Sequence, residues 1–369
     1  MKRLWPILLV LLWTGTLRAA GDQAYLGVFA ETRVQQMAGM PKMPALPPGM
    51  DLSNLPGGAA MMGMGRPMRS LEVRLWSPGI APAEASAFLE VPEGLGQGKR
   101  LNLDLYRPKP GQAEPEAAGP VAPDFTIKIY WGSSATVRPG QPKVIRMADL
   151  AGEAKAAVQR QGPQGARGTY FYKPDWTTGY WPTGRQPGQI GEQASLVGHY
   201  ALTTTFAGSV PIDDPQNVDF LAPIELTSPD LSKQVALDGA IMLAWKLVPG
   251  LLGQHAMVMG MEGKSTLVLW TSAETASAPA MGDWGYLEMA KVRELVSQGV
   301  LMKPDRTNAI VPAGIFKNAD VANLMMIGYG PGTALDTGQP LPRIQTKTTL
   351  SVMLGGKGMS GMEGIGAGE

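Results

Sequence analysis

Residues 254–271 read QHAMVMGMEGKSTLVLWT, and this stretch decides the fold class. Its apolar and β-branched residues predict two short strands, Gln254–Met261 and Ser265–Thr271. Gly263 and Lys264 supply the turn between them. Two strands joined by one short turn indicate an antiparallel sheet.

Alternating apolar and polar residues recur elsewhere in the chain. Ser70–Trp76 reads SLEVRLW, with Glu72 and Arg74 on the face opposite its leucines and valine. Such alternation is typical of a half-buried strand, so we expect a mainly β protein. The other predicted strands are Tyr25–Val34, Ala87–Val91, Arg100–Tyr106, Asp124–Trp131, Ser195–Phe206, Ile241–Trp245, Thr307–Val311, Leu324–Gly328 and Thr346–Leu354.

Two segments repeat their apolar residues at steps of three and four, which is helical spacing. Ile145–Gln161 ends before Gly162 and Pro163, and Tyr286–Val296 ends before Gly299. The pattern predicts one helix in each half of the chain.

The first twenty residues predict a cleaved secretory signal. Lys2 and Arg3 precede Leu4–Leu17, an uncharged run that is shorter than the ~20 residues of a membrane-spanning helix. Ala19 and Ala20 supply the small residues of a cleavage site. We therefore expect an exported protein, located in the periplasm, at the cell surface or outside the cell, with no transmembrane helix after cleavage.

Composition divides the expected mature chain. Residues 21–212 are predicted to form an N-terminal β-sandwich, interrupted by a flexible insert at 36–69 that is rich in Met, Pro and Gly. A connector at 213–229 leads to a second sandwich at 230–354, and the Gly- and Met-rich tail at 355–369 is expected to be disordered. The expected architecture is two tandem antiparallel β-sandwiches, each with one helical insertion.

The second predicted domain resembles an immunoglobulin-like or fibronectin type III sandwich. The resemblance rests on the strand Ile241–Trp245, which is followed by Pro249 and Gly250 before the next strand starts at Gln254. Domains of that class carry a strand-borne Trp beneath two antiparallel sheets. The helix at Tyr286–Val296 departs from their plan and leaves the strand order open.

Three further runs resemble an uncharacterised family of exported bacterial proteins. They are WTTGYWPT at Trp176–Thr183, LVGHYALTTTF at Leu196–Phe206 and PLPRIQTKTTL at Pro340–Leu350. The resemblance covers most of the mature chain. It implies export and carries no known activity.

Composition also excludes several classes of site. The chain has Cys 0 and His 2, which rules out disulfides, thiolate metal sites and thiol catalysis. Signal cleavage would remove three basic residues, so that 32 basic against 31 acidic residues becomes 29 against 31. A surface so close to neutral gives no electrostatic attraction to nucleic acid.

Known catalytic motifs do not occur in the sequence. It holds no G-x-S-x-G, H-E-x-x-H or S-x-x-K pattern. Gly260–Ser265 resembles a phosphate-binding loop, but its first glycine is too close to the lysine and strands flank it on both sides. Asp213 and Asp214 lie between prolines, which favours a turn over a catalytic carboxylate pair. We therefore expect a protein that is not an enzyme.

Aromatic residues concentrate at 170–181, among prolines and glycines. We interpret this segment as a loop and Tyr172, Trp176, Tyr180 and Trp181 as candidate binding residues. Exposed rings of this kind provide flat platforms for sugar rings or for side chains of a partner protein. The alternative is that the rings close one end of the sandwich core.

The methionines form the most unusual pattern. Candidate ligands for Cu(I) lie in two clusters of the insert, namely Met37, Met40 and Met43, and Met61, Met62 and Met64. Thioether sulfur is a soft ligand, and no cysteine competes with it here. The alternative interpretation is an adaptable apolar contact surface.

One predicted strand places His255, Met257, Met259 and Met261 on a single face. This row has the ligand types of a metal-binding face. The favoured interpretation is a core stripe in which Met fills irregular gaps.

These observations favour a non-catalytic structural or protein-binding module of the bacterial cell envelope. Carbohydrate binding through the Trp176–Trp181 segment and Cu(I) binding through the Met clusters are the alternatives. Apart from Cu(I), no cofactor is expected. The expected partner is an envelope protein or a glycan, and not nucleic acid.

Overall fold

The computed structural model describes residues 24–39, 64–107, 125–150, 176–186, 188, 190–212, 218–276, 285–336 and 339–355. The predicted signal peptide, the tail after Gly355, Tyr172 and four of the six candidate copper ligands lie outside these residues. The predicted helix Ile145–Gln161 is described only as far as Leu150.

The described residues form three sheets and one α-helix, so the expectation of a mainly β protein is confirmed. Sheet A has ten strands in the order β5-β8-β2-β1-β17-β16-β13-β14-β6-β7, sheet B has the order β10-β9-β3-β4, and sheet C has the order β11-β12-β15. The strands of sheet A are β1 (Tyr25–Met37), β2 (Met68–Ser77), β5 (Asp104–Tyr106), β6 (Thr126–Trp131), β7 (Lys143–Arg146), β8 (Thr177–Trp181), β13 (Gly253–Glu262), β14 (Thr266–Thr271), β16 (Val321–Asp336) and β17 (Gln339–Gly355). Sheets B and C contain β3 (Ala87–Glu90), β4 (Arg100–Asn102), β9 (Tyr200–Thr204), β10 (Ser209–Ile212), β11 (Leu226–Ser228), β12 (Ile241–Trp245) and β15 (Asn308–Val311). Short 3₁₀ turns occur at η1 (Glu93–Leu95) and η2 (Met147–Asp149).

Sheet A is mixed, and this departs from the predicted pair of antiparallel sandwiches. β1 pairs in parallel with β17, and β14 pairs in parallel with β6. Strands from both predicted domains therefore lie in one sheet. The difference has a physical reason, because alternation specifies that a segment is a strand but not which strand pairs with it.

Two hydrophobic cores lie along one face of sheet A. Sheet B packs on one half of this face and sheet C on the other, and β1 and β17 contribute to both cores. The first core includes Val34, Leu243, Trp245, Trp270, Leu324, Leu350 and Val352. The second includes Val28, Val73, Leu89, Trp181, Tyr200 and Ile344.

The predicted connector takes part in this packing. Val218 belongs to the core beneath sheet B, whereas Leu221 and Ile224 belong to the core beneath sheet C. Leu226–Ser228 is strand β11 of sheet C. The described part of the connector therefore ties the two halves of the molecule together.

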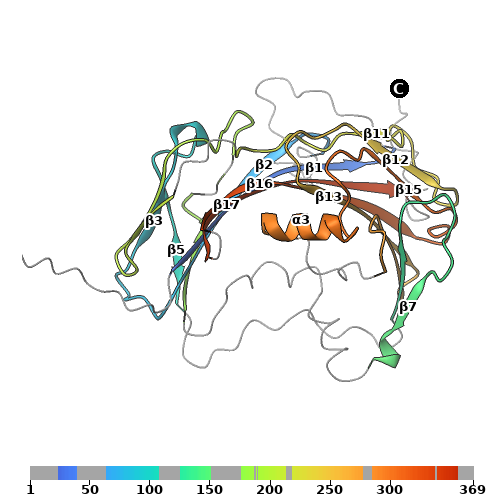
Figure 1. Ribbon diagram of the computed structural model, residues 1–369, viewed down its shortest axis with the longest axis horizontal. Coiled ribbons are helices and arrows are strands. Elements are labelled where there is room, and N and C mark those ends of the chain that lie inside the picture. The colour runs from blue at the N-terminus through green and yellow to red at the C-terminus, as the bar shows by residue number, and fades with distance from the viewer. Residues whose placement is uncertain are drawn as a thin grey trace, which may run out of the picture.

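The opposite face of sheet A carries the helix α3 (Met289–Ser297). Figure 1 shows sheet A as an arch with α3 beneath it. Val292 and Leu295 of the helix pack against Ile327 and Tyr329 of β16. We call this side of sheet A the helix face.

Glycine makes the close approach of the helix possible. A Cβ atom on Gly253 of β13 would lie 2.7 Å from Val296 Cγ2 and 3.0 Å from Val292 Cγ1. The helix begins at Met289, later than the predicted Tyr286, and Gly299 follows it with a φ of 71°. A left-handed glycine just past the last turn is a common helix ending.

Three local predictions are wrong. Ile145 lies in strand β7, where it pairs with Ile127, and the helical spacing that follows it starts with the 3₁₀ turn η2. The segment Arg100–Tyr106 is not one strand, because β4 joins sheet B and β5 joins sheet A. The presumed aromatic loop contains β8, which pairs with β2 and β5 inside sheet A.

In the described part of the chain, no helix has the length and apolar character needed to cross a membrane.

Candidate ligand pocket and its surroundings

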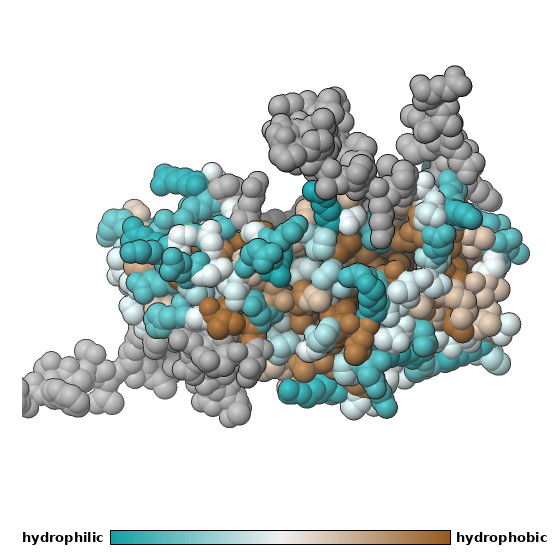
Figure 2. Space-filling view, turned by 90° about the horizontal axis from the view of Figure 1, so that it is seen from above, coloured by the Kyte–Doolittle hydropathy of each residue, from teal (hydrophilic) through white to brown (hydrophobic). Residues whose placement is uncertain are grey.

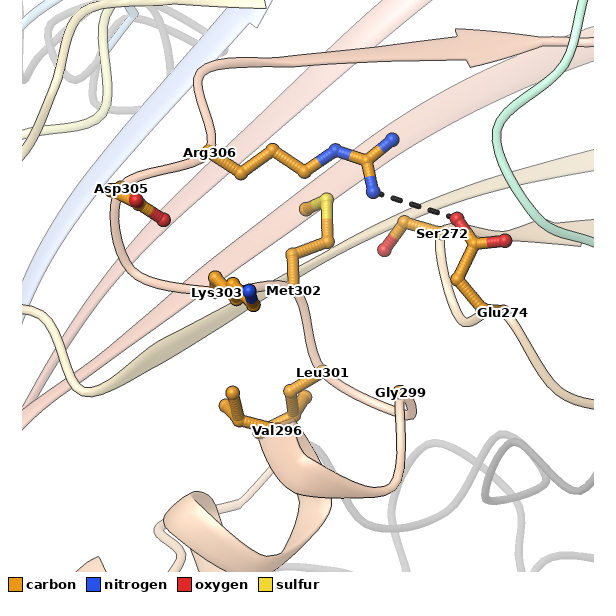
Figure 3. A pocket seen from close by; sticks show the side chains of 9 residues that line it. All are labelled: Ser272, Glu274, Val296, Gly299, Leu301, Met302, Lys303, Asp305 and Arg306. Carbon is orange, nitrogen blue, oxygen red and sulfur yellow. Dashed lines mark hydrogen bonds and ion pairs between the residues drawn. The ribbon is translucent and has the colours of Figure 1, made fainter.

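A pocket of about 230 Å³ lies where the C-terminal end of α3 approaches the end of β14 and the loop before β15. Figure 3 shows the side chains that surround it. One wall is apolar, and charged groups form the rim. The lining residues are Ser272, Glu274, Val296, Gly299, Leu301, Met302, Lys303, Asp305 and Arg306.

A single buried amide fixes the loop that carries the charged rim. Gln254 is only 2% exposed, and its Nε2 donates to the carbonyl oxygens of Lys303 at 2.9 Å and Arg306 at 2.5 Å. Its Oε1 accepts a hydrogen bond from Trp245 Nε1 at 3.1 Å. Because these bonds lie in a low-dielectric core, breaking them would cost more than at the surface. Gln254 therefore fixes the position of the loop that carries Lys303 and Arg306.

Opposite charges alternate around the rim. Arg138 Nη1 lies 2.8 Å from Glu274 Oε2, and Arg306 Nη1 lies 3.5 Å from Glu274 Oε1. Figure 3 shows Arg306 reaching across the pocket to Glu274. Glu274 is thus shared by two cations, while Lys303 is exposed and forms no ion pair with another described residue. Among the lining residues, Lys303 and Arg306 balance Glu274 and Asp305, and Arg138 beside them adds one positive charge.

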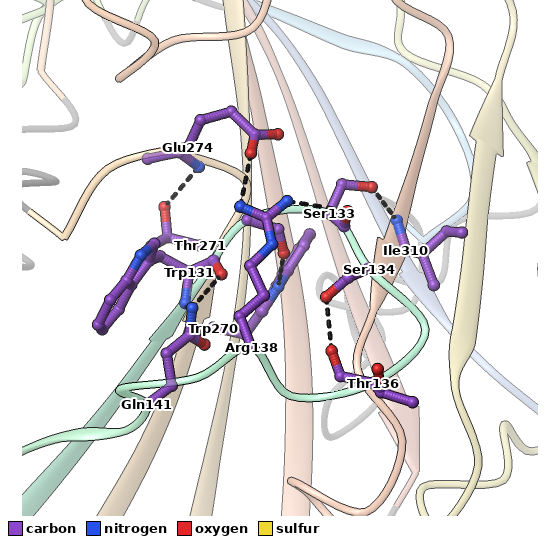
Figure 4. Close-up of polar contacts among 12 residues, drawn as sticks. Trp131, Ser133, Ser134, Thr136, Arg138, Gln141, Trp270, Thr271, Glu274 and Ile310 are labelled. Carbon is purple, nitrogen blue, oxygen red and sulfur yellow. Dashed lines mark hydrogen bonds and ion pairs between the residues drawn. The ribbon is translucent and has the colours of Figure 1, made fainter.

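The loop between β6 and β7 supports this rim from the side (Figure 4). Arg138 Nη2 donates to the carbonyl oxygen of Ser133 at 3.1 Å, and Ser133 Oγ accepts from the backbone N–H of Ile310 at 2.8 Å. Trp270 Nε1 donates to the carbonyl oxygen of Gly132 at 2.9 Å. These bonds join the loop to sheets A and C and hold Arg138 beside Glu274.

His255 lies behind the pocket and is closed to ligands. It is 1% exposed, its Nδ1 lies 3.3 Å from the carbonyl oxygen of Val300, and its Nε2 lies 2.8 Å from Thr271 Oγ1. Burial lowers the pKa of His255 to about 3, so the ring is neutral, donates to Val300 and accepts from Thr271. Both nitrogens are occupied, which agrees with the interpretation of His255 as a core residue.

The predicted aromatic binding residues are divided between the two faces of sheet A. Trp181 is 1% exposed and lies in the core beneath sheet B. Trp176 lies on the helix face, where its ring stacks on Tyr25 with 5.6 Å between centroids, and Tyr180 lies beneath the Arg74 guanidinium. The alternation of β8 causes this division. Both tryptophans are buried in packing and do not form one exposed platform.

The helix face carries a charged cluster that no sequence motif indicates. Glu31 Oε2 lies 3.2 Å from Arg33 Nη2 and 3.7 Å from Lys347 Nζ, and its Oε1 accepts from Thr349 Oγ1 at 2.5 Å. Lys347 Nζ also lies 4.3 Å from the ring centroid of Tyr286. The alternation in β1 and β17 places these residues on the same face of their own strands. The pairing of β1 with β17 brings them together.

Burial and charge act in opposite directions on this cluster. Burial alone would raise the pKa of Glu31, but Lys347 and Arg33 outweigh it and the pKa is lowered. Burial lowers the pKa of Lys347, and Glu31 opposes that shift. Glu31 is thus held as a carboxylate by its neighbours.

Two of the six candidate copper ligands are described. Met37 ends β1, and Met64 forms an isolated bridge with Gln35. Among the described residues, no group of three His, Cys, Asp or Glu side chains is placed to hold a metal ion.

No protein-family model, no curated protein and no solved structure matches this chain, so the resemblance to exported bacterial proteins stays a prediction.

Proposed function

We propose that this protein is a non-catalytic, exported binding module of the bacterial cell envelope, and that it holds a carboxylate beside an apolar group of a partner protein in the pocket. The observation that carries the proposal is the pairing of an apolar wall with two cationic side chains, Lys303 and Arg306, on a loop that Gln254 holds in place. Export and the envelope rest on the N-terminal sequence pattern alone.

The size of the pocket favours a fragment of a partner over a free ligand. Small-molecule sites usually start at about 300 Å³, and this pocket has about 230 Å³. That volume suits one side chain or a chain end. Leu301 and Met302 would contact the apolar part of such a group, since both line the pocket and are buried.

The rim favours an acidic group. Glu274 is already paired with Arg138 and Arg306, so a second carboxylate would find Arg306 and Lys303 as its partners. Arg can present two parallel donors to a carboxylate, which fixes the orientation of the group. An amide of the same shape would lose most of this attraction.

The outer surface supports a role in protein contacts. Apolar patches lie between hydrophilic side chains on the side of the molecule seen from above (Figure 2). The most exposed large apolar side chains among the described residues are Leu247 at 58% and Met242 at 54%. Contiguous apolar patches rimmed by polar side chains are typical of protein-binding surfaces. Carbohydrate binding through Trp176, Tyr180 and Trp181 has less support, because the packing that buries both tryptophans leaves them no free face.

The pocket chemistry is tested with 4-methylpentanoate and its amide as matched probes. The carboxylate should shift the NMR signals of the Met302 methyl group and of the amides at residues 302–306, and 4-methylpentanamide should not. The double variant Lys303→Gln and Arg306→Gln should lose the response. The control is Lys246→Gln, because Lys246 forms a surface pair with Glu225 and does not line the pocket. Equal responses to both probes, or a response that survives in the double variant, would contradict the proposal.

A further inference from the structure

The register of sheet A gathers methionines from three strands on the helix face. Met257 of β13 lies directly opposite Met325 of β16. Met259 lies opposite Asn323, and Asn323 lies opposite Met353 of β17 on its other side. Directly opposite residues have Cβ atoms about 5 Å apart and diagonal neighbours about 7–8 Å apart, within reach of a long flexible side chain. Met325 thus has Met257 beside it and Met259 and Met353 on its diagonals.

These methionines are packed against the protein, but three of them remain partly exposed to solvent. Met257 is buried, whereas Met259, Met325 and Met353 are half-buried. Their neighbours on the same face of the sheet include Leu269, opposite Met259, and Ser351, which lies opposite Met325 and donates to Asn323 Oδ1. Thr271, which lies opposite Met257, already bonds to His255. Apart from Asn323 and Ser351, which bond to each other, the thioether sulfurs are the main donor atoms among these register partners.

The donor set selects the kind of ion. Thioether sulfur is soft and neutral, and it suits Cu(I) rather than hard or divalent cations. A divalent ion would bring a charge that neutral ligands in apolar surroundings do not offset. A monovalent soft cation such as Cu(I) carries half that charge, and several thioether sulfurs can serve as its ligands.

We propose that Met257, Met259 and Met325 form a Cu(I) site on the helix face, with Met353 at its border. The site is distinct from the two sequence clusters in the insert and from the pocket. It does not use His255, whose two nitrogens are bonded within the protein. Met37 is the register partner of Met353, so the insert leaves sheet A next to this methionine surface.

The test is anaerobic transfer of Cu(I) from its bicinchoninate complex to the purified full chain. The wild type should remove about one equivalent of Cu(I) per chain. The triple variant Met257→Leu, Met259→Leu and Met325→Leu should bind at least tenfold more weakly. Leucine keeps the volume and the apolar character of methionine, so the fold should survive.

Two matched variants locate the site. Met68→Leu with Met242→Leu removes two exposed methionines elsewhere and should leave binding unchanged. Met40→Leu, Met43→Leu, Met61→Leu and Met62→Leu tests the insert and should also leave it unchanged. Retained binding in the sheet triple variant, or loss in either matched variant, would overturn the proposal.

A second measurement covers the case in which the triple variant does not fold. Ag(I), which mimics Cu(I) without redox chemistry, is added to wild-type protein labelled at the methionine methyl carbons. The signals of Met257, Met259 and Met325, assigned through single Met→Leu variants, should shift together at one equivalent. Shifts confined to other methionines would overturn the proposal, and so would no shift at all.

Discussion

Lys347 lies directly beside Glu31 in the neighbouring parallel strand, with its Nζ 3.7 Å from Glu31 Oε2. Both side chains are largely withdrawn from water, with 12% and 10% of their areas exposed. The pair sits at the contact between β1 and β17, which belong to opposite ends of the chain. It therefore links the two strands whose pairing makes sheet A continuous.

The losses from removing each partner of this pair should not add up when both are removed. Lys347→Met and Glu31→Gln should each lower the free energy of unfolding by about 3 kcal/mol, because Glu31→Gln leaves Lys347 without its carboxylate and Lys347→Met leaves Glu31 with Arg33 as its one cation. The double variant should lose clearly less than the sum of the two. Urea unfolding of the four proteins in this cycle measures the coupling. Additive losses would mean that the pair makes no net contribution.

Acid should weaken the protein partly through Glu31. Its pKa in the folded chain lies below the ordinary value of 4.5, so the unfolded state binds the proton more readily. The stabilisation is full above 4.5 and is lost as the pH falls through the folded pKa. The free energy of unfolding should therefore fall more steeply in wild type than in Glu31→Gln between about pH 6 and pH 3. Glu90→Gln, an exposed carboxylate, is the control, and equal slopes in wild type and Glu31→Gln would contradict the assignment.

Gln254 should control both stability and the pocket. Gln254→Leu leaves the carbonyl oxygens of Lys303 and Arg306 and the indole N–H of Trp245 without their partner. We expect a loss of about 2–4 kcal/mol and faster hydrogen exchange at residues 303–306. Gln298→Leu, an exposed amide at the end of α3, should change stability by less than about 0.5 kcal/mol. Unchanged exchange in the loop would show that Gln254 does not hold it.

Gly253 should be required for the packing of α3. A Cβ there would meet Val296 at 2.7 Å, so Gly253→Ala should destabilise the protein by about 1–3 kcal/mol and raise hydrogen exchange in α3. Gly239→Ala is the matched control, because no heavy atom lies within 4 Å of the added Cβ. Equal melting temperatures for the two variants would contradict the close approach of helix and sheet.

Local patterns predicted most of the strands. SLEVRLW became β2, and the opening stretch became β13 and β14 with bounds shifted by one residue at several ends. The helix at Tyr286–Val296 was also found, with a later start. Alternation and helical spacing are properties of a single segment, so they can be read without knowledge of its neighbours.

Long-range pairing could not be predicted in the same way. Tyr25–Val34 shows no sign that its partner lies more than 300 residues away, as Glu31 and Lys347 do. The same gap explains the candidate sites. The sequence predicts Trp176 and Trp181 as loop aromatics, because it does not show that β2 and β5 pair on either side of β8. The pocket depends on contacts of Gln254 and Glu274 with the loop at 303–306, and the sequence does not predict the position of that loop.

The most direct test of the proposed function is photo-crosslinking in the native cell envelope. A benzophenone amino acid replaces Asp305, which is exposed and lines the pocket. We predict a discrete adduct with one partner protein, lost when Lys303→Gln and Arg306→Gln are added and retained with Lys246→Gln. An adduct that persists in the double variant, or no protein adduct at all, would contradict the account.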